Sequence, residues 1–226
     1  MASVIENPDI PETDLQNIVS KSFEKLLKIR HEEAAKKCGI VYLAGTGDKD
    51  SRYIVNLLNK TYTVELGSKT ILDLMTGRPA GGKLSYVILS YIMSDGGGSG
   101  PETWHPVAKL LKTQSLVSYY QKYVTRPIIR IFGYDKQLFE RCATQLGGVK
   151  ERLGGNSFSF KFLPKVKLVF QLWVGSREEF SQPEVSISYN THALKYLSTV
   201  SLIYACEVMA NFLERESRGR QVRGRE

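Results

Sequence analysis

The apolar positions of the chain are densest, and their period is clearest, between residues 156 and 189. Every second residue from Phe158 to Phe162 is a phenylalanine, which is typical of a strand with one buried face. The run 166–174 is almost continuously apolar, as in a central strand covered on both faces, and alternation returns over 185–189. We therefore predict three successive strands in the middle of one sheet.

Elsewhere, apolar residues three and four positions apart predict amphipathic helices. Asp14 stands where it would cap the first helix, and Gly39 has the conformational freedom to end the second. Pro127 must begin or kink a helix, because its ring removes a backbone donor. The predicted helices cover residues 15–27, 31–38, 83–93, 116–132, 136–146 and 194–213.

Runs of β-branched and aromatic residues separated by turn residues predict a meander of three strands over 40–44, 53–58 and 61–66. Residues 104–111 predict a further strand or an irregular edge, interrupted by Pro106. Strands of this kind beside several helices define an α+β fold. We expect a single domain in which an antiparallel or mixed sheet of about six to seven strands packs with helices.

The 226 residues carry a formal net charge of +8, and part of this excess lies at the C-terminal end. Residues 215–226 hold five arginines and two glutamates in a stretch too polar to pack. We therefore expect disordered tails at 1–13 and 215–226 around a single domain, 14–214. The basic tail has an alternative role as an electrostatic arm that binds nucleic-acid phosphates.

Neither a signal peptide nor a membrane span is recognisable in the sequence, so we expect a cytoplasmic protein. The cysteines lie too far apart for a disulfide framework or a paired metal site. We interpret each of them, Cys38, Cys142 and Cys206, as a small packing residue rather than a reactive thiol.

Residues 77–83 fit the spacing Gly-x-x-x-x-Gly-Lys, which in a phosphate-binding loop places backbone N–H groups and a lysine at the start of a helix. Position 84 is leucine, however, where a magnesium-binding hydroxyl is required, and Pro79 lies inside the loop. Nucleotide hydrolysis is therefore not expected. We interpret the loop as the entrance to a helix, able at most to hold an anion.

Other candidate catalytic groups are isolated. None of His31, His105 and His192 has a second histidine or a cysteine at ligand spacing, so we expect no zinc site. Glu178 and Glu179 could pair for acid–base chemistry, but adjacent residues in a turn point in different directions. We interpret both as solvated charges of a turn, and we lean toward a protein that is not an enzyme.

Aromatic and basic residues alternate in the region from Trp104 to Arg130, a composition suited to stacking on planar ligands while cations meet phosphates or carboxylates. At helical spacing Lys122, Arg126 and Arg130 share one face. The alternative is an amphipathic helix with a solvated basic side. The candidate ligand-binding residues are Trp104, His105, Tyr119, Tyr120, Lys122, Arg126 and Arg130.

Several short motifs occur together: Gly147-Gly148, Phe162-Leu-Pro-Lys-Val166, Leu172-Trp-Val-Gly175, Glu178-Glu-Phe180 and the segment ending at Phe132-Gly133. As a set they resemble a family of bacterial and archaeal proteins known only as a domain of unknown function. The resemblance covers about residues 14–213 and implies a cytoplasmic, anaerobic setting, with some relatives fused to iron–sulfur segments. In relatives an acid precedes the Glu-Phe pair; here Ser176-Arg177 intervene, and the scattered cysteines offer no cluster-binding segment. No catalytic residue can be transferred.

Together these observations lead us to expect a non-catalytic binding module for a small anionic or planar ligand, or for a protein partner. The cofactor, if any, and the oligomeric state stay open. Nucleic-acid binding through the basic tail and the face formed by Lys122, Arg126 and Arg130 is one alternative, and an enzyme of unrecognised type is another.

Overall fold

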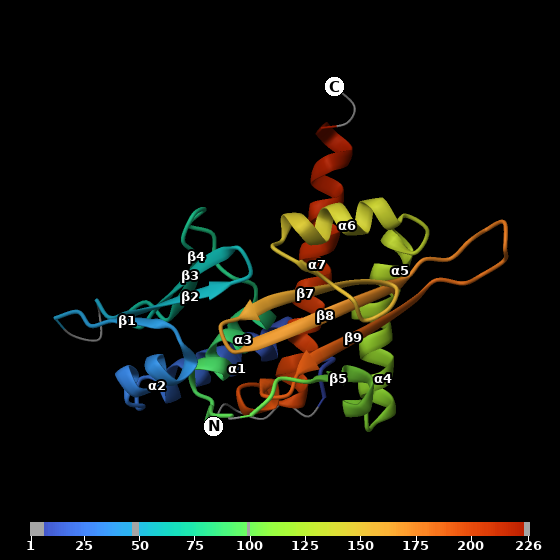
Figure 1. Cartoon of the computed structure of the whole chain (residues 1–226). Coiled ribbons are helices and arrows are strands. Elements are labelled where there is room, and N and C mark those ends of the chain that lie inside the picture. The colour runs from blue at the N-terminus through green and yellow to red at the C-terminus, as the bar shows by residue number, and fades with distance from the viewer. Residues whose placement is uncertain (1–6, 47–49, 99, 224–226) are drawn as a thin grey trace.

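The computed structural model describes residues 7–46, 50–98 and 100–223 (Figure 1). Its strands form two antiparallel sheets, one of four strands and one of five. The α+β class and the single-domain arrangement are confirmed, but the expected single sheet is divided in two. The division arises because the strands of the meander pair only with one another, and helices separate them from the later strands.

The five-stranded sheet contains the three strands predicted from the dense apolar region, and they lie in its middle as expected. Phe158 pairs with Phe170, which in turn pairs with Ile187, and all three side chains are buried. The strand order is β5-β9-β8-β7-β6, with β5 (Trp104–Pro106), β6 (Val149–Glu151), β7 (Asn156–Leu163), β8 (Val166–Trp173) and β9 (Glu184–Asn190).

The four-stranded sheet is the predicted meander with one strand added. Residues 70–73, for which no strand was predicted, pair antiparallel with the third strand, and residues 47–49 of the first hairpin loop lie outside the described residues. The backbone N–H of Leu58 donates to the carbonyl of Phe162, which links the two sheets. The strands are β1 (Val41–Leu43), β2 (Arg52–Leu57), β3 (Lys60–Glu65) and β4 (Thr70–Asp73).

Four predicted helices are present with small shifts at their ends, whereas the predicted helix 116–132 is divided and the predicted helix 194–213 is found at 199–223. The predicted cap at Asp14 is wrong, because the helix begins two residues earlier, after Pro11, and Asp14 lies in its first turn. The helices are α1 (Glu12–Leu26), α2 (His31–Cys38), α3 (Gly82–Ile92), α4 (Gln114–Tyr120), α5 (Arg126–Phe132), α6 (Lys136–Gln145) and α7 (Thr199–Arg223).

Helix α7 packs against α3, α5 and α6 and, in Figure 1, passes behind the five-stranded sheet. It continues through residues 215–223, where the sequence led us to expect disorder; residues 224–226 lie outside the described part. A salt bridge of 2.6 Å between Arg218 and Glu214, one turn apart, supports this extension. Part of the predicted basic tail is therefore helix.

The predicted N-terminal tail also differs where it is described. Pro8 is buried, and its carbonyl accepts a 2.8 Å hydrogen bond from the hydroxyl of Tyr204 on α7. Residues 1–6 lie outside the described residues. In the described ranges, none of the helices is both long and apolar enough to span a membrane.

The three cysteines are buried free thiols, as expected of packing residues. Burial raises the pKa of Cys38 to about 11, and it raises that of Cys206 still further. A thiol with a raised pKa is a poor nucleophile near neutral pH, because little of it is thiolate.

Candidate functional site: a cavity between the β4–α3 loop and helix α7

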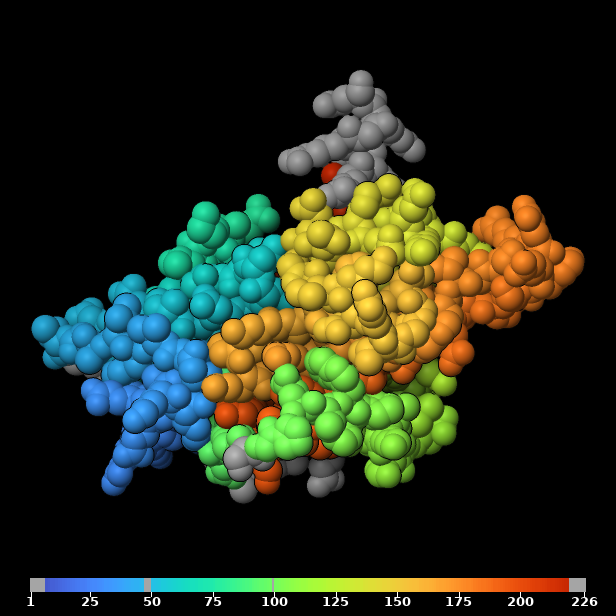
Figure 2. All heavy atoms as spheres, in the orientation of Figure 1, coloured from blue at the N-terminus to red at the C-terminus, as the bar shows by residue number. Residues whose placement is uncertain are grey.

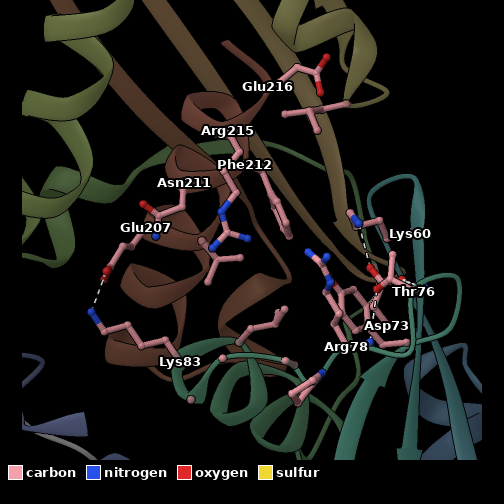
Figure 3. A pocket seen from close by; sticks show the side chains of 18 of the residues that line it. Lys60, Asp73, Thr76, Arg78, Lys83, Glu207, Asn211, Phe212, Arg215 and Glu216 are labelled. Carbon is pink, nitrogen blue, oxygen red and sulfur yellow. Dashed lines mark hydrogen bonds and ion pairs between the residues drawn. The ribbon is translucent and has the colours of Figure 1, made fainter. Parts of the chain in front are cut away.

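A cavity of about 630 Å³ lies between the loop that joins β4 to α3 and the C-terminal half of α7 (Figure 3). Its walls include Leu84, Leu146, Val208 and Phe212 on the apolar side. The volume falls within the range of small-molecule sites, which combine apolar walls with a few polar groups. The loop contains the glycine-rich motif that we identified in the sequence.

Asp73, the last residue of β4, fixes the beginning of this loop. Its Oδ1 atom accepts hydrogen bonds from the backbone N–H groups of Met75 and Thr76, at 3.0 and 3.1 Å. Its Oδ2 atom accepts a 2.8 Å bond from the ammonium group of Lys60. These hydrogen bonds, the one from Lys60 most of all, hold the pKa of Asp73 below its ordinary value.

The far side of the loop returns to β4. The N–H of Asp73 donates to the carbonyl of Arg78 at 2.9 Å, and the N–H of Ala80 donates to the carbonyl of Ile71 at 2.8 Å. Gly77, between them, has a φ of +66°, a region that side chains disfavour. The backbone of Arg78 is thus fixed against the sheet, which places its side chain at the mouth of the cavity.

Two arginines extend into the cavity from opposite walls. Arg78 comes from the loop and Arg215 from α7, and in Figure 3 both guanidinium groups point to the space beside the ring of Phe212. In the described part of the chain, neither guanidinium group has an ion-pair partner. The cavity therefore presents two guanidinium groups without a described ion-pair partner beside an aromatic ring, and the acids Glu12 and Glu216 also line it.

Tyr62 lies in the same wall, and its phenol responds to these charges. Burial, and to a smaller extent the carboxylate of Asp73, raise its pKa to about 12, and the cation of Arg215 opposes both. The phenol is thus protonated near neutral pH, and its hydroxyl can donate a hydrogen bond as well as accept one.

Lys83 does not have the position that a phosphate-binding lysine would need. In Figure 3 it extends along the edge of the cavity toward Glu207, and its ammonium group lies 2.7 Å from a carboxylate oxygen. The other oxygen accepts a 2.5 Å hydrogen bond from Tyr119. The ammonium also lies 5.0 to 5.7 Å from the ring centres of Tyr119, Tyr123 and Tyr204. This lysine is compensated within the protein.

The N-terminal end of α3 is also approached by an acid. Gly81 provides no side-chain cap, but a carboxylate oxygen of Glu12 lies 2.4 Å from where a Cβ on Gly82 would stand. A carboxylate is favourable at this end of a helix. An anionic ligand would therefore meet the two arginines rather than the helix end.

The residues predicted from the sequence are distributed differently. Trp104 and His105 lie on β5, where His105 contacts Thr103, Thr191 and the ring of Tyr189. Tyr119 and Tyr120 are buried in the core. A ligand-binding role for this set stays a prediction. Tyr119 is connected to the cavity only indirectly, because its hydroxyl donates a hydrogen bond to Glu207, which lines the cavity.

The basic residues of the same segment are exposed, and their expected common face is interrupted. A π-helical stretch, Gln121–Thr125, separates α4 from α5, and the N–H of Arg126 bonds to the carbonyl of Gln121, five residues back. Pro127 lacks the donor that would continue regular α-helix. Lys122, Arg126 and Arg130 are therefore not spaced as on one regular helix, and Arg130 pairs with Glu214 at 3.3 Å.

Sequence reasoning identified the loop but missed its key residues. Arg78 lay within the glycine-rich motif, whereas Arg215 was assigned to the tail. Glu207 had a recognisable signal, because it is an acid on the apolar face of a long helix. The described residues contain no cluster of histidine, cysteine, aspartate and glutamate suited to a metal ion. Glu178 and Glu179 are exposed in a turn, as predicted.

The fold and site define an α+β protein with a ligand-sized cavity that carries two inward-facing arginines. Comparison with known proteins places it more specifically. Residues 30–212 match the family described as Domain of unknown function (DUF3786), and the chain belongs to this family. The resemblance noted in the sequence is thereby confirmed. No curated protein and no solved structure matches the chain.

Proposed function

We propose that the protein binds a small anionic ligand in the cavity between the β4–α3 loop and α7. The single observation that carries this proposal is the pair of guanidinium groups, Arg78 and Arg215, which face one cavity without carboxylate partners in the described structure. Two like charges that share a partly apolar space repel each other, and an anion between them would relieve this repulsion.

The remaining groups of the cavity support this assignment. Lys60 and Lys83 are neutralised by Asp73 and Glu207, at 2.8 and 2.7 Å, so they add little net charge. Glu12 and Glu216 also line the cavity, and the two arginines are the lining cations that no described acid pairs with. Guanidinium groups bind carboxylates and phosphates through two parallel hydrogen bonds, which favours either of these anions.

The apolar wall adds a requirement on the rest of the ligand. Phe212, Val208 and Leu146 line the cavity, and such surfaces favour an aromatic or other apolar body beside the anionic group. We therefore propose an anion with a planar or apolar portion. We propose binding rather than catalysis, because the acids Asp73 and Glu207 are already paired with Lys60 and Lys83 and are not available to exchange protons with a ligand.

Native mass spectrometry of protein purified without added ligand tests the proposal. We expect a retained small molecule in the wild type, and its loss in Arg78→Ala and in Arg215→Ala. Arg141→Ala is the matched control, because Arg141 is exposed on α6 and away from the cavity lining. Ligand-free wild-type protein that also fails to bind added aromatic carboxylates or phosphate esters would contradict the proposal.

A further inference from the structure

The connection between β8 and β9 forms a second unusual feature, an arm made of residues 174–183. Figures 1 and 2 show it projecting from the body of the molecule. At its base the N–H of Gly175 donates to the carbonyl of Gly133 at 2.9 Å. The guanidinium of Arg177 lies 5.2 Å from the ring centre of Tyr134, which ties the arm to the end of α5.

The tip of the arm is a closed turn. Ser176 and Ser181 exchange two backbone hydrogen bonds, of 3.1 and 3.0 Å. The hydroxyl of Ser181 also accepts from the N–H of Ser176, and the hydroxyl of Ser176 accepts from the N–H of Glu179. These bonds give the four residues between the serines a defined conformation.

That conformation displays an aromatic ring to solvent. Phe180 is 89% exposed and has a φ of +53°, a region that is unfavourable for a bulky residue by about 1 kcal/mol. Exposure of a large aromatic side chain on a projecting turn is typical of an interaction element. Among the described residues, no aromatic or cation–π contact involves the ring of Phe180.

The tip is also acidic, in a chain whose net charge is +8. Glu178 and Glu179 precede Phe180, so the turn presents carboxylates next to an aromatic ring. This is the chemistry that the cavity accepts, since Arg78 and Arg215 supply the cations there. Met75, on the loop that joins β4 to α3, is an apolar side chain that is 85% exposed.

We infer that the tip of the arm docks into the cavity of a second copy of this chain. Figure 1 shows the arm and β4 on opposite sides of the molecule, so the arm does not reach its own cavity. The contact is therefore head-to-tail, and copies would add in a row unless the rotation closes a ring. A single inserted turn buries little surface, so the association is weak and competes with a small anion.

This inference shares the cavity with the proposed function but does not require the small ligand. Sedimentation velocity of the full chain at low salt tests it. We expect the weight-average mass to rise with concentration, and both Phe180→Ser and Arg78→Glu to weaken association by about tenfold or more. The single change Glu179→Arg should act likewise, whereas Glu179→Arg combined with Arg78→Glu in one chain should restore association.

Glu32→Arg is the control, because it makes the same change of charge as Glu179→Arg at an exposed position on α2; it should leave association unchanged. A monomer mass throughout the concentration range would overturn the inference, and so would association that survives both Phe180→Ser and Arg78→Glu. Anion binding measured in Phe180→Ser separates the two claims. Retained anion binding without association leaves the proposed function standing alone, and association without anion binding leaves only the docking.

Discussion

The segment from Tyr119 to Arg130 and the cavity beside Arg78 both combine aromatic rings with basic side chains, yet they direct them in opposite ways. In the first, the rings of Tyr119 and Tyr120 are buried and the cations face solvent. In the second, Arg78 and Arg215 point into the cavity beside the ring of the buried Phe212. The same composition thus serves packing in one region and, in our proposal, ligand recognition in the other.

The two regions meet at Glu207. Its carboxylate accepts from Tyr119 on one side and pairs with Lys83 at the edge of the cavity on the other. A buried carboxylate is tolerated only when its charge is compensated and its oxygens are hydrogen-bonded. The aromatic segment therefore has an identifiable structural task, which is to complete the surroundings of this acid.

The largest expected effect comes from removing that acid. Glu207→Ala leaves Lys83 and the hydroxyl of Tyr119 without their partner and should destabilise the fold by about 3–5 kcal/mol in urea denaturation. Replacing both charged residues, as Lys83→Met with Glu207→Leu, should recover most of the loss. A cost below about 1 kcal/mol for the single change would contradict the structural role of this pair.

A smaller effect is expected from Tyr119→Phe, which deletes one hydroxyl and keeps the ring. The lost hydrogen bond is to a charged group, so the expected cost is about 1.5–3 kcal/mol by chemical denaturation. Tyr134→Phe serves as the control, because that ring is 45% exposed and its hydroxyl makes only a 3.5 Å contact. Equal stabilities of the two variants would remove the argument that the hydrogen bond from Tyr119 to Glu207 stabilises the fold.

The stability that Asp73 contributes by anchoring the cavity loop should depend on pH. The folded-state pKa of Asp73 is lowered, so its contribution to stability is complete above the ordinary value of 3.8 and is lost as the pH falls through the lower folded value. The stability difference between wild type and Asp73→Asn should therefore be constant near neutral pH and shrink below about pH 4. A difference that grows on acidification has the wrong sign for this account.

The smallest effects are expected on the exposed side of the aromatic segment. Lys122→Ala and Arg126→Ala should each change stability by no more than about 0.5 kcal/mol, because both side chains face solvent. Their thermal midpoints should match that of the wild type. A large loss in either variant would show that the segment holds a charge network beyond the contacts described above.

Sequence patterns predicted the strands well because each element buries its own face. The alternating phenylalanines of β7 and the continuous apolar run of β8 needed no information from distant residues. The division into two sheets depends on which strands pair, and this is a property of long-range contacts. The helical end of α7 was missed because its polar composition resembles that of a solvated tail.

The site was less accessible to sequence reasoning for a related reason. Alternation of rings and cations over Tyr119 to Arg130 says nothing about the direction of each side chain, and the π-helical stretch changes that direction. Arg78 and Arg215 lie 137 positions apart, counted as 215 minus 78, so only the fold brings them together. The glycine-rich loop and the acid Glu207 on an apolar helix face were the local signals within the region that we propose as the site.

The most direct measurement of the central claim is the shift in thermal midpoint caused by a panel of aromatic carboxylates and phosphate esters. At about a hundred times the dissociation constant, a ligand adds about 2.7 kcal/mol and should raise the midpoint by several degrees. We expect this shift in the wild type and in Lys122→Ala with Arg126→Ala, and its absence in Arg78→Ala with Arg215→Ala. A shift that disappears in the first double variant and persists in the second would contradict the assignment of the ligand site to the cavity.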